Sequence, residues 1–249
     1  MLSEHVLRHA LEQIGANAPV RFDEVTGSTN ATALELAAAG APEWALVAAA
    51  HQTQGRGRLG REWRDEPGDA LMFSLVLRPN LAPHRAGLIT LLAGACMAGA
   101  AHELGTAVRC KWPNDLTVRS GKAGGILAES VVSGDRFDHV VLGVGVNIGP
   151  RTPDVPGAAA LDVDDRELLE AFLRVFADAY VPAHPGFPAE VVERYRPVCA
   201  TLGLRVRAFT TEGTTVEGEA VDVDETGALI VGTSDGLELV RSGEVEHLR

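Results

Sequence analysis

Up to about residue 200, short apolar runs alternate along the chain with longer segments in which apolar residues recur at helical spacing. Short continuous runs are typical of buried strands, and a spacing of three and four is typical of a helix with one buried face. Strands are predicted at 22–25, 45–50, 71–77, 107–111, 125–132 and 140–148, and helices at 30–39, 83–104, 168–176 and 191–198. This mixture predicts an α/β fold of the α+β type, in which helices flank a central mixed sheet.

From about Gly203 the pattern changes to short alternating segments separated by Gly, Asp and Thr turns, at 204–209, 216–222, 228–231, 237–240 and 245–248. Short strands at such close spacing predict a small β-barrel. We therefore expect two domains, a first one over residues 1–200 and a small barrel over residues 201–249.

Composition excludes several classes of protein. A hydrophobic content of 46% and a mean hydropathy of +0.06 indicate a soluble globular chain. The net charge of −12 opposes a nucleic-acid-binding face, which requires clustered cations. The three cysteines, Cys96, Cys110 and Cys199, form no C-x-x-C pair and are expected to be reduced core residues.

Neither the N-terminus nor the most apolar segment predicts a membrane or export segment. The residues after Met1 lack the basic stretch and apolar run of a signal peptide. The most apolar segment, 86–101, is shorter than the about twenty residues that span a bilayer. We interpret it as a buried helix and expect a cytoplasmic protein without a membrane partner.

Lysine is rare in this chain, which has twenty arginines but only two lysines, Lys111 and Lys122. A GC-rich genome replaces Lys with Arg wherever any surface cation suffices. A lysine that persists therefore indicates a position that needs a compact ammonium on a flexible stem, which the planar guanidinium does not supply. At least one of the two is expected to be catalytic.

A glycine–arginine loop follows the predicted strand at 45–50. Gly55, Gly57 and Gly60 satisfy the dinucleotide-binding pattern G-x-G-x-x-G, but residues 61–68 show no helical apolar period and run into a proline, so that interpretation is disfavoured. Glycines let a backbone fold over a ligand, and guanidinium groups bind phosphate or carboxylate in a bidentate way. The loop therefore predicts a mobile anion-binding segment, rather than a solvated surface loop.

The lysine-containing segment predicts chemistry at a second place. Pro113 and Asn114 form a turn after a strand, which brings Asp115 and Lys122 to one edge of the sheet. An acid and an ammonium beside an anion site suggest that Asp115 positions Mg²⁺ while Lys122 neutralises charge on a phosphoryl or carboxylate group. A structural salt bridge between the two remains open on spacing alone.

Five segments in this order closely resemble the biotin protein ligases, and the resemblance covers nearly the whole chain. They are Gly27-Ser28-Thr29-Asn30, the stretch from Gln52 to Arg61, Lys111-Trp112-Pro113-Asn114-Asp115, Lys122-Ala123-Gly124-Gly125-Ile126-Leu127, and Gly143-Val144-Gly145-Val146-Asn147. The resemblance implies a catalytic domain followed by an SH3-like barrel. It also implies that biotin and ATP give biotinyl-5′-AMP, and that the acyl group then passes to a lysine of a biotin carboxyl carrier protein, such as that of acetyl-CoA carboxylase.

The resemblance also implies roles for individual residues. Lys122, Asp115 and Arg58 would be catalytic, with Asp115 near Mg²⁺. Biotin would be bound by Ser28, Thr29, Asn30, Gln52, Gly55, Arg56, Gly57, Arg58, Lys122 and Gly125. ATP and the adenylate would be bound by Arg58, Arg61, Trp63, Lys111, Asn114, Lys122 and Asn147. Ala50, Gln54 and Leu59 depart from the residues frequent at those positions of the family, which leaves the dynamics of the loop open.

Three other functions share part of this pattern. A lipoate or octanoate ligase or transferase shares the general fold, but the glycine–arginine loop favours biotin. A repressor would need a DNA-binding module, and only about twenty-seven residues precede Ser28 in an acidic chain. A non-catalytic vitamin-binding protein would release no pyrophosphate. The sequence leaves open the oligomeric state, monomer or weak homodimer, and the base that deprotonates the carrier lysine.

Overall fold

The first part of the chain is built on one seven-stranded mixed sheet. The computed structural model describes residues 1–150 and 154–248, and its strand order is β1-β2-β3-β7-β6-β5-β4. β1 and β2 are parallel, and every other neighbouring pair is antiparallel. The strands are β1 (Val20–Asp23), β2 (Leu46–Ala49), β3 (Ala70–Leu77), β4 (Arg109–Lys111), β5 (Asp115–Val118), β6 (Gly121–Ser133) and β7 (Arg136–Asn147).

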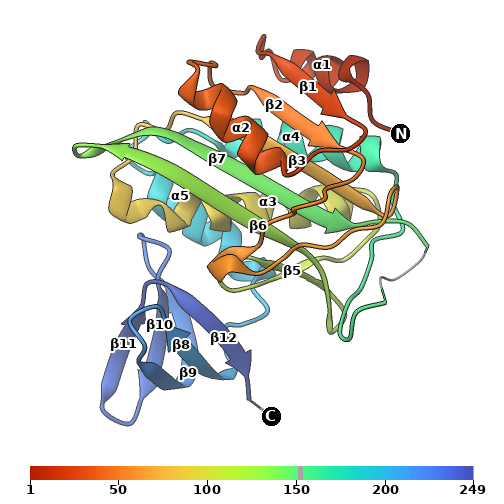
Figure 1. The fold of residues 1–249 in the computed structure, drawn as a ribbon. Helices are drawn as coiled ribbons and strands as arrows, with labels where there is room; N and C mark the ends of the chain where they lie inside the picture. The colour runs from red at the N-terminus through yellow and green to blue at the C-terminus, as the bar shows by residue number, and fades with distance from the viewer. Residues whose placement is uncertain (151–153, 249) are drawn as a thin grey trace.

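Helices cover the two faces of this sheet unequally (Figure 1). Of the helices in the described residues, one face carries α2 alone, which packs a small cluster around Ala33 and Ala37 onto Val47, Val76 and Val141. The other face carries most of the core. The helices are α1 (Glu4–Gln13), α2 (Thr29–Ala38), α3 (Gly87–Glu103), α4 (Asp165–Ala179) and α5 (Phe187–Tyr195). The expected mixed sheet flanked by helices is confirmed.

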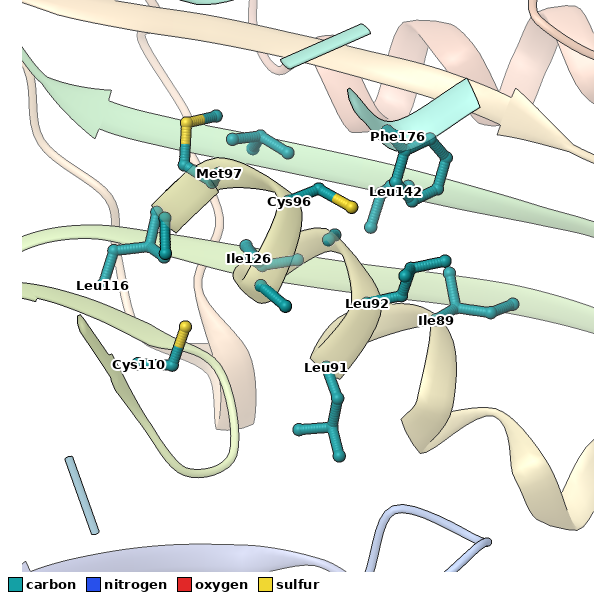
Figure 2. Close-up of a cluster of buried hydrophobic side chains, with 14 of the residues drawn as sticks. Ile89, Leu91, Leu92, Cys96, Met97, Cys110, Leu116, Ile126, Leu142 and Phe176 are labelled. Carbon is teal, nitrogen blue, oxygen red and sulfur yellow. The ribbon is translucent and has the colours of Figure 1, made fainter. Parts of the chain in front are cut away.

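Helix α3 lies at the centre of the larger core. Figure 2 shows Leu92, Cys96 and Met97 of this helix among side chains of neighbouring strands, such as Ile126 and Leu142. By length and composition alone the segment Pro83–Glu103 could cross a membrane, but 67% of its most apolar window is buried inside the fold. This burial supports the interpretation of the segment as a core helix. All three cysteines are buried and free, as predicted.

Two elements were not predicted. α1 packs Leu7, Ala10 and Leu11 into the core and is capped by Ser3, whose hydroxyl accepts a hydrogen bond from Val6 N. β5 is only four residues long and pairs with β4 to form a hairpin, so it shows no period of its own in the sequence. Elsewhere the predicted boundaries are shifted by a few residues. β6 and β7, for example, each begin four residues earlier than expected.

The C-terminal sheet is the five-stranded antiparallel sheet formed by residues 205–247, in the order β11-β10-β9-β8-β12. It is the small β unit that the alternating pattern predicted, although β11 and β12 are edge strands here and no closed barrel is described among residues 1–150 and 154–248. The strands are β8 (Arg205–Thr210), β9 (Thr215–Val223), β10 (Leu229–Thr233), β11 (Gly236–Val240) and β12 (Gly243–His247).

The C-terminal sheet is attached to the rest of the chain at specific points. The indole Nε1 of Trp112 donates a hydrogen bond to Gly227 O at 3.0 Å, and Arg196 forms a bidentate ion pair with Asp222 at 2.8 Å. Gly227 has a φ of +86°, and a Cβ there would lie 3.0 Å from the backbone of Gly87 at the start of α3. A side chain at this turn would therefore separate the two units.

Candidate active site

A cavity of about 300 Å³ opens on the α2 face of the large sheet, and glycines form its floor. In β7 the alternating residues Leu142 and Val144 belong to the larger core, whereas Gly143 and Gly145 line the cavity together with Gly125 of β6. Since successive side chains of a strand point to opposite faces, this alternation leaves one face packed and the other bare. The volume lies at the lower end of the range for small-molecule sites.

The bare strip allows two side chains to approach the sheet closely. A Cβ at Gly143 would lie 2.0 Å from Asn30 Oδ1, and a Cβ at Gly145 would lie 3.0 Å from the indole ring of Trp63. A larger residue at either position would displace a side chain that lines the cavity. The Gly-x-Gly spacing of β7 thus makes room for Asn30 at one end of the cavity and for Trp63 at the other.

One end of the cavity is a buried network of mostly neutral polar groups at the start of α2. Gln52 Oε1 accepts hydrogen bonds from Thr29 N at 2.7 Å and from Thr29 Oγ1 at 3.1 Å. The Ser74 hydroxyl lies 2.8 Å from Thr29 Oγ1 and 2.6 Å from Asn30 Oδ1. The Ser28 hydroxyl makes no capping hydrogen bond although Ser28 is the N-cap of α2, so it is available to a ligand.

Two carboxylates, those of Glu129 and Asp65, hold residues of this neutral end in position. Asn30 Nδ2 donates to Glu129 Oε2 at 2.8 Å, which settles the orientation of the Asn30 amide toward the Ser74 hydroxyl. The fully buried carboxylate of Asp65 lies 2.9 Å from His51 Nδ1 and accepts from Gln52 N at 3.4 Å. Thr29, Asn30 and Gln52 are thus held in place by hydrogen bonds before any ligand arrives.

The glycine–arginine loop folds back on itself beside the cavity. Trp63 N donates to Gly55 O at 3.0 Å, and Gly57 N donates to Arg61 O at 2.7 Å. Gly55 is required at the neck of the loop, because a Cβ there would lie 2.5 Å from Trp63 O. The segment between these bonds lines the cavity on one side and an open hollow on the other, so it forms a thin flap.

Arginines of this loop reach two different partners. Arg58 Nη1 donates to Asn114 Oδ1 at 3.3 Å, and Arg61 Nη2 donates to Glu244 Oε2 of the C-terminal sheet. Burial lowers the pKa of Arg58, while the charges of Glu244 and Asp115 oppose that shift. The guanidinium nevertheless remains a cation, because arginine does not deprotonate in proteins.

The other end of the cavity is charged and is built on the β4–β5 hairpin and the start of β6. Lys122 Nζ donates to Asp115 Oδ1 at 2.6 Å, and the two side chains are 47% and 26% exposed. Asn114 fixes the turn, because its Nδ2 donates to Ile126 O and its main-chain oxygen accepts from Ile126 N, both at 3.0 Å. The predicted meeting of Asp115 and Lys122 is therefore present, as an ion pair.

A metal site formed by protein groups alone is not found. Over residues 1–150 and 154–248, no group of three or more His, Cys, Asp or Glu side chains could hold a metal ion. Asp115 contributes one carboxylate beside Lys122 at the charged end of the cavity. Such a donor suits Mg²⁺ only when phosphates and waters supply the remaining ligands, which is the usual arrangement for that ion.

The structure brings together most of the residues singled out in the sequence. The cavity is lined by Ser28, Thr29, Asn30, Gln52, Arg56, Gly57, Arg58, Arg61, Trp63, Lys111, Asn114, Asp115, Lys122 and Gly125. Gly55 lies at the neck of the loop outside this lining. Asn147 is also outside it, and its Nδ2 donates to Ala159 O at 2.9 Å. Their roles toward a ligand stay predictions.

Sequence reasoning missed several groups that touch or support the cavity. Phe209, Glu244 and Glu246 of the C-terminal sheet line it, and Ser74, Glu129 and Asp65 orient residues that do. Ser74 could have been noticed as the one polar residue in the apolar run 71–77. The others carry no local signal, and all but Asp65 lie far along the chain from the residues around them in the cavity.

Comparisons with known proteins agree on one family. Residues 22–147 match the biotin/lipoate A/B protein ligase family, and residues 201–248 match the biotin protein ligase C-terminal domain. The chain is 34% identical to a biotin--[acetyl-CoA-carboxylase] ligase of Mycobacterium tuberculosis, covering 100% of this chain and 96% of the relative. It is 31% identical to the bifunctional ligase/repressor BirA of Bacillus subtilis, covering 98% of this chain and 79% of that protein.

A solved structure shows the same fold. The biotin protein ligase from Aquifex aeolicus in complex with biotin and ATP superposes with a TM-score of 0.73 at 23% identity, covering 93% of this chain and 99% of the other. The likeness extends over both sheets of the molecule.

Proposed function

This chain belongs to the biotin/lipoate A/B protein ligase family, and on that premise we propose how its residues divide the work of an ATP-dependent biotin protein ligase. The enzyme joins biotin to ATP to form biotinyl-5′-AMP and pyrophosphate, and then transfers the biotinyl group to a lysine of a carrier protein. The observation that carries the assignment of roles is that one cavity has a neutral end at Thr29 and Gln52 and a charged end at Lys122 and Arg58.

The neutral end suits the ureido ring of biotin. That ring is uncharged and has both hydrogen-bond donors and acceptors. It can therefore bind to hydroxyl and amide groups without burying an unpaired charge. We assign Ser28, Thr29, Asn30 and Gln52 to this contact. The aliphatic chain of biotin, which ends in its carboxylate, would be lined by Gly125 of the floor and by Arg56 and Gly57 of the loop.

The charged end suits the two anions that must meet. The biotin carboxylate attacks the α-phosphate of ATP, and Lys122 offsets the repulsion between them once a phosphate oxygen replaces its bond to Asp115. Lys111, Asn114, Arg58 and Arg61 would contact the nucleotide, with Trp63 beside its base. Mg²⁺, when bound through the phosphates and Asp115, supplies further charge neutralisation.

The loop has a role in keeping the intermediate. Biotinyl-5′-AMP is a labile mixed anhydride, so a flap that excludes water preserves it until the carrier lysine arrives. That lysine must lose a proton before it attacks the acyl carbon, and AMP then leaves. Asp115 is our candidate for accepting this proton, because its carboxylate lies at the charged end of the cavity, 2.6 Å from Lys122 Nζ.

The wider assignments follow from the same premise. We propose a catalytic domain over residues 1–200 and an SH3-like domain over residues 201–249, a biotin carboxyl carrier protein such as that of acetyl-CoA carboxylase as the protein substrate, and a cytoplasmic location. The net charge of −12 supports a ligase without a nucleic-acid partner.

The experiment that tests the function is pyrophosphate release by the purified protein. Release is expected with biotin and ATP, and labelling of a biotin carboxyl carrier domain is expected when that domain is added. Lipoate and octanoate, supplied separately, test the other ligases of the family. Release with either of these acids but not with biotin would contradict the assignment, as would release by a folded Lys122→Ala variant at the rate of the unmodified chain.

A further inference from the structure

A segment that leads into the C-terminal sheet lies beside the edge strand β4. Cys110 of β4 and Cys199 form a parallel bridge, in which Ala200 N donates to Cys110 O at 2.7 Å. Arg109 Nη2 also donates to Cys199 O at 2.8 Å. Ala200 N therefore satisfies a main-chain carbonyl of β4 that an edge strand would otherwise leave open.

The next residue, Thr201, is fully buried and has two partners. Its Oγ1 accepts a hydrogen bond from Trp112 N at 3.0 Å and lies 3.1 Å from Nε2 of His247 in β12. A hydroxyl has one proton to donate. If His247 Nε2 is the acceptor, that proton has a partner and the chain of bonds runs from Trp112 N through Thr201 to His247. If Nε2 carried a proton instead, the buried Thr201 proton would need another acceptor.

The state of His247 favours the first arrangement. Burial lowers the pKa of His247, and the nearby ammonium of Lys111 lowers it further. The imidazole is therefore held neutral near pH 7, and a neutral imidazole with its proton on Nδ1 offers Nε2 as an acceptor.

Trp112 thus gives both of its N–H groups to the C-terminal part of the chain. Its main-chain N–H goes to Thr201, and its indole N–H goes to Gly227 O at 3.0 Å. The residues on either side of Trp112, from Lys111 to Asp115, all line the charged end of the cavity. The position of that turn is consequently set by the C-terminal sheet rather than by the large sheet alone.

We propose that Thr201 and His247 form a positioning pair that holds the turn 112–115 in register for ATP, so that the C-terminal sheet contributes to the adenylation step. The inference rests on the proposed function and extends it to two residues that do not touch the nucleotide. The neutral end of the cavity is formed by Thr29, Asn30 and Gln52, and none of these bonds to either residue. The pair should therefore affect ATP and spare biotin.

The test uses the full-length protein and two variants that break the chain of bonds. Thr201→Val keeps the shape of the side chain but removes the hydroxyl, which leaves Trp112 N–H buried without an acceptor. A buried unsatisfied donor typically costs enough to change an equilibrium about tenfold. We expect kcat/KM for ATP to fall by about that factor, mainly through KM, and His247→Leu to cause a smaller loss in the same direction.

Conservative variants separate positioning from mere stability. Thr201→Ser keeps the hydroxyl, and His247→Gln keeps an acceptor near the position of Nε2, so both should restore ATP kinetics to within about twofold of the unmodified enzyme. Thr214→Val makes the same chemical change on an exposed turn of the C-terminal sheet and serves as the control. Circular dichroism and calorimetry with biotin are measured for every variant.

The outcomes distinguish this inference from the proposed function. If the unmodified chain releases no pyrophosphate from biotin and ATP, the proposed function fails. If it does, and folded Thr201→Val and His247→Leu keep its KM for ATP, the positioning role is wrong. Loss of biotin affinity in parallel with ATP, or failure of Thr201→Ser and His247→Gln to restore the kinetics, would show a structural role only. If Thr201→Val does not fold, normal ATP kinetics of His247→Leu alone overturn the inference.

Discussion

The two ends of the cavity are organised in opposite ways. At the neutral end, Thr29, Asn30 and Ser74 are at most 4% exposed, and each is held by hydrogen bonds to other side chains. At the charged end, Lys122 is 47% exposed and Arg61 is 65% exposed, and each is paired with a carboxylate of the protein itself. At the neutral end the side chains are already fixed without ligand, whereas at the charged end the cations are paired with carboxylates of the protein.

This difference teaches what each substrate must do on binding. Biotin meets groups whose positions are already fixed, so little ordering is required. ATP meets cations that must exchange one anionic partner for another, and exposed pairs of that kind are weak and screened by salt. We expect ATP binding to weaken as ionic strength rises, while biotin binding changes little.

Removing the ammonium should produce the largest effect. Lys122→Ala is expected to lower the rate of biotinyl-5′-AMP formation by about 10² to 10³, because one charge-stabilising contact in the transition state is lost. Lys122→Arg should not restore the rate, since the planar guanidinium differs in shape from an ammonium. Single-turnover pyrophosphate release measures both, with the exposed Arg136→Ala as control. A rate in the folded Lys122→Ala variant close to that of the unmodified enzyme would remove Lys122 from the mechanism.

Filling the floor should damage the neutral end selectively. The Cβ of Gly143→Ala would overlap Asn30 Oδ1, and overpacking of this kind costs about 1–3 kcal/mol. Biotin affinity measured by calorimetry should fall by about 5- to 150-fold, and the KM for ATP should change far less. Gly99→Ala is the matched control, because a Cβ there makes only an ordinary contact at 3.7 Å with Val175. Equal losses for both substrates would contradict the division into two ends.

Opening the flap should release the intermediate. Arg58→Gly removes the hydrogen bond between the loop and Asn114, so biotinyl-5′-AMP should dissociate about tenfold faster and label lysines of unrelated proteins. Dissociation of radiolabelled adenylate and labelling of added serum albumin measure this. Arg64→Gly, which alters an exposed arginine just beyond the loop, should retain the adenylate normally. If both variants hold the adenylate equally well, Arg58 does not retain it.

Breaking an internal ion pair should have a smaller effect in the opposite direction. Glu244→Gln frees Arg61 and removes a negative charge from the cavity, so the KM for ATP should fall, by up to about fivefold. Glu238→Gln makes the same change of charge on the distant edge strand β11 and should leave KM unchanged. A higher KM in Glu244→Gln would indicate that Glu244 orders the loop and does not compete with the nucleotide.

The smallest effect concerns pH. Burial, followed by the charge of Lys111, lowers the pKa of His247 below its ordinary value of 6.5. The unfolded chain therefore binds the proton more readily than the folded one, and the free energy of unfolding falls as pH drops through about 6.5. Urea denaturation at pH 7.5 and 5.5 should show a smaller loss of stability on acidification in His247→Gln than in the unmodified chain. Equal losses would mean that His247 does not contribute to the acid sensitivity.

The sequence predicted the fold and the residues that line the cavity better than it predicted the hydrogen bonds and ion pairs between those residues. Apolar runs such as 71–77 and 140–148 predicted central strands, because burial on both faces selects apolar residues whatever their partners. Lys122 and Asp115 stood out through a rare residue type and a turn between them. Most of the residues expected at the site came together because they belong to segments that form adjacent strands and one loop.

What could not be predicted depends on contacts between distant parts of the chain. Asn30 meets Glu129 across ninety-nine positions, and Arg61 meets Glu244 across 183. No local period reports such pairings. The C-terminal segment carries no recognisable catalytic motif. Contacts of Phe209 and Glu244 with the cavity, and of His247 with Thr201, depend on how the two sheets face each other.

The glycine floor has a consequence for the range of acids that the enzyme can accept. Because Gly143, Gly145 and Gly125 already carry no side chain, no substitution at these three positions can enlarge the cavity. Enlargement must come from walls such as Leu127, whose replacement by alanine would leave space for a bulkier analogue of the ligand. In an engineered labelling enzyme built on this scaffold, the cavity would therefore be enlarged at such wall residues and not at the three glycines.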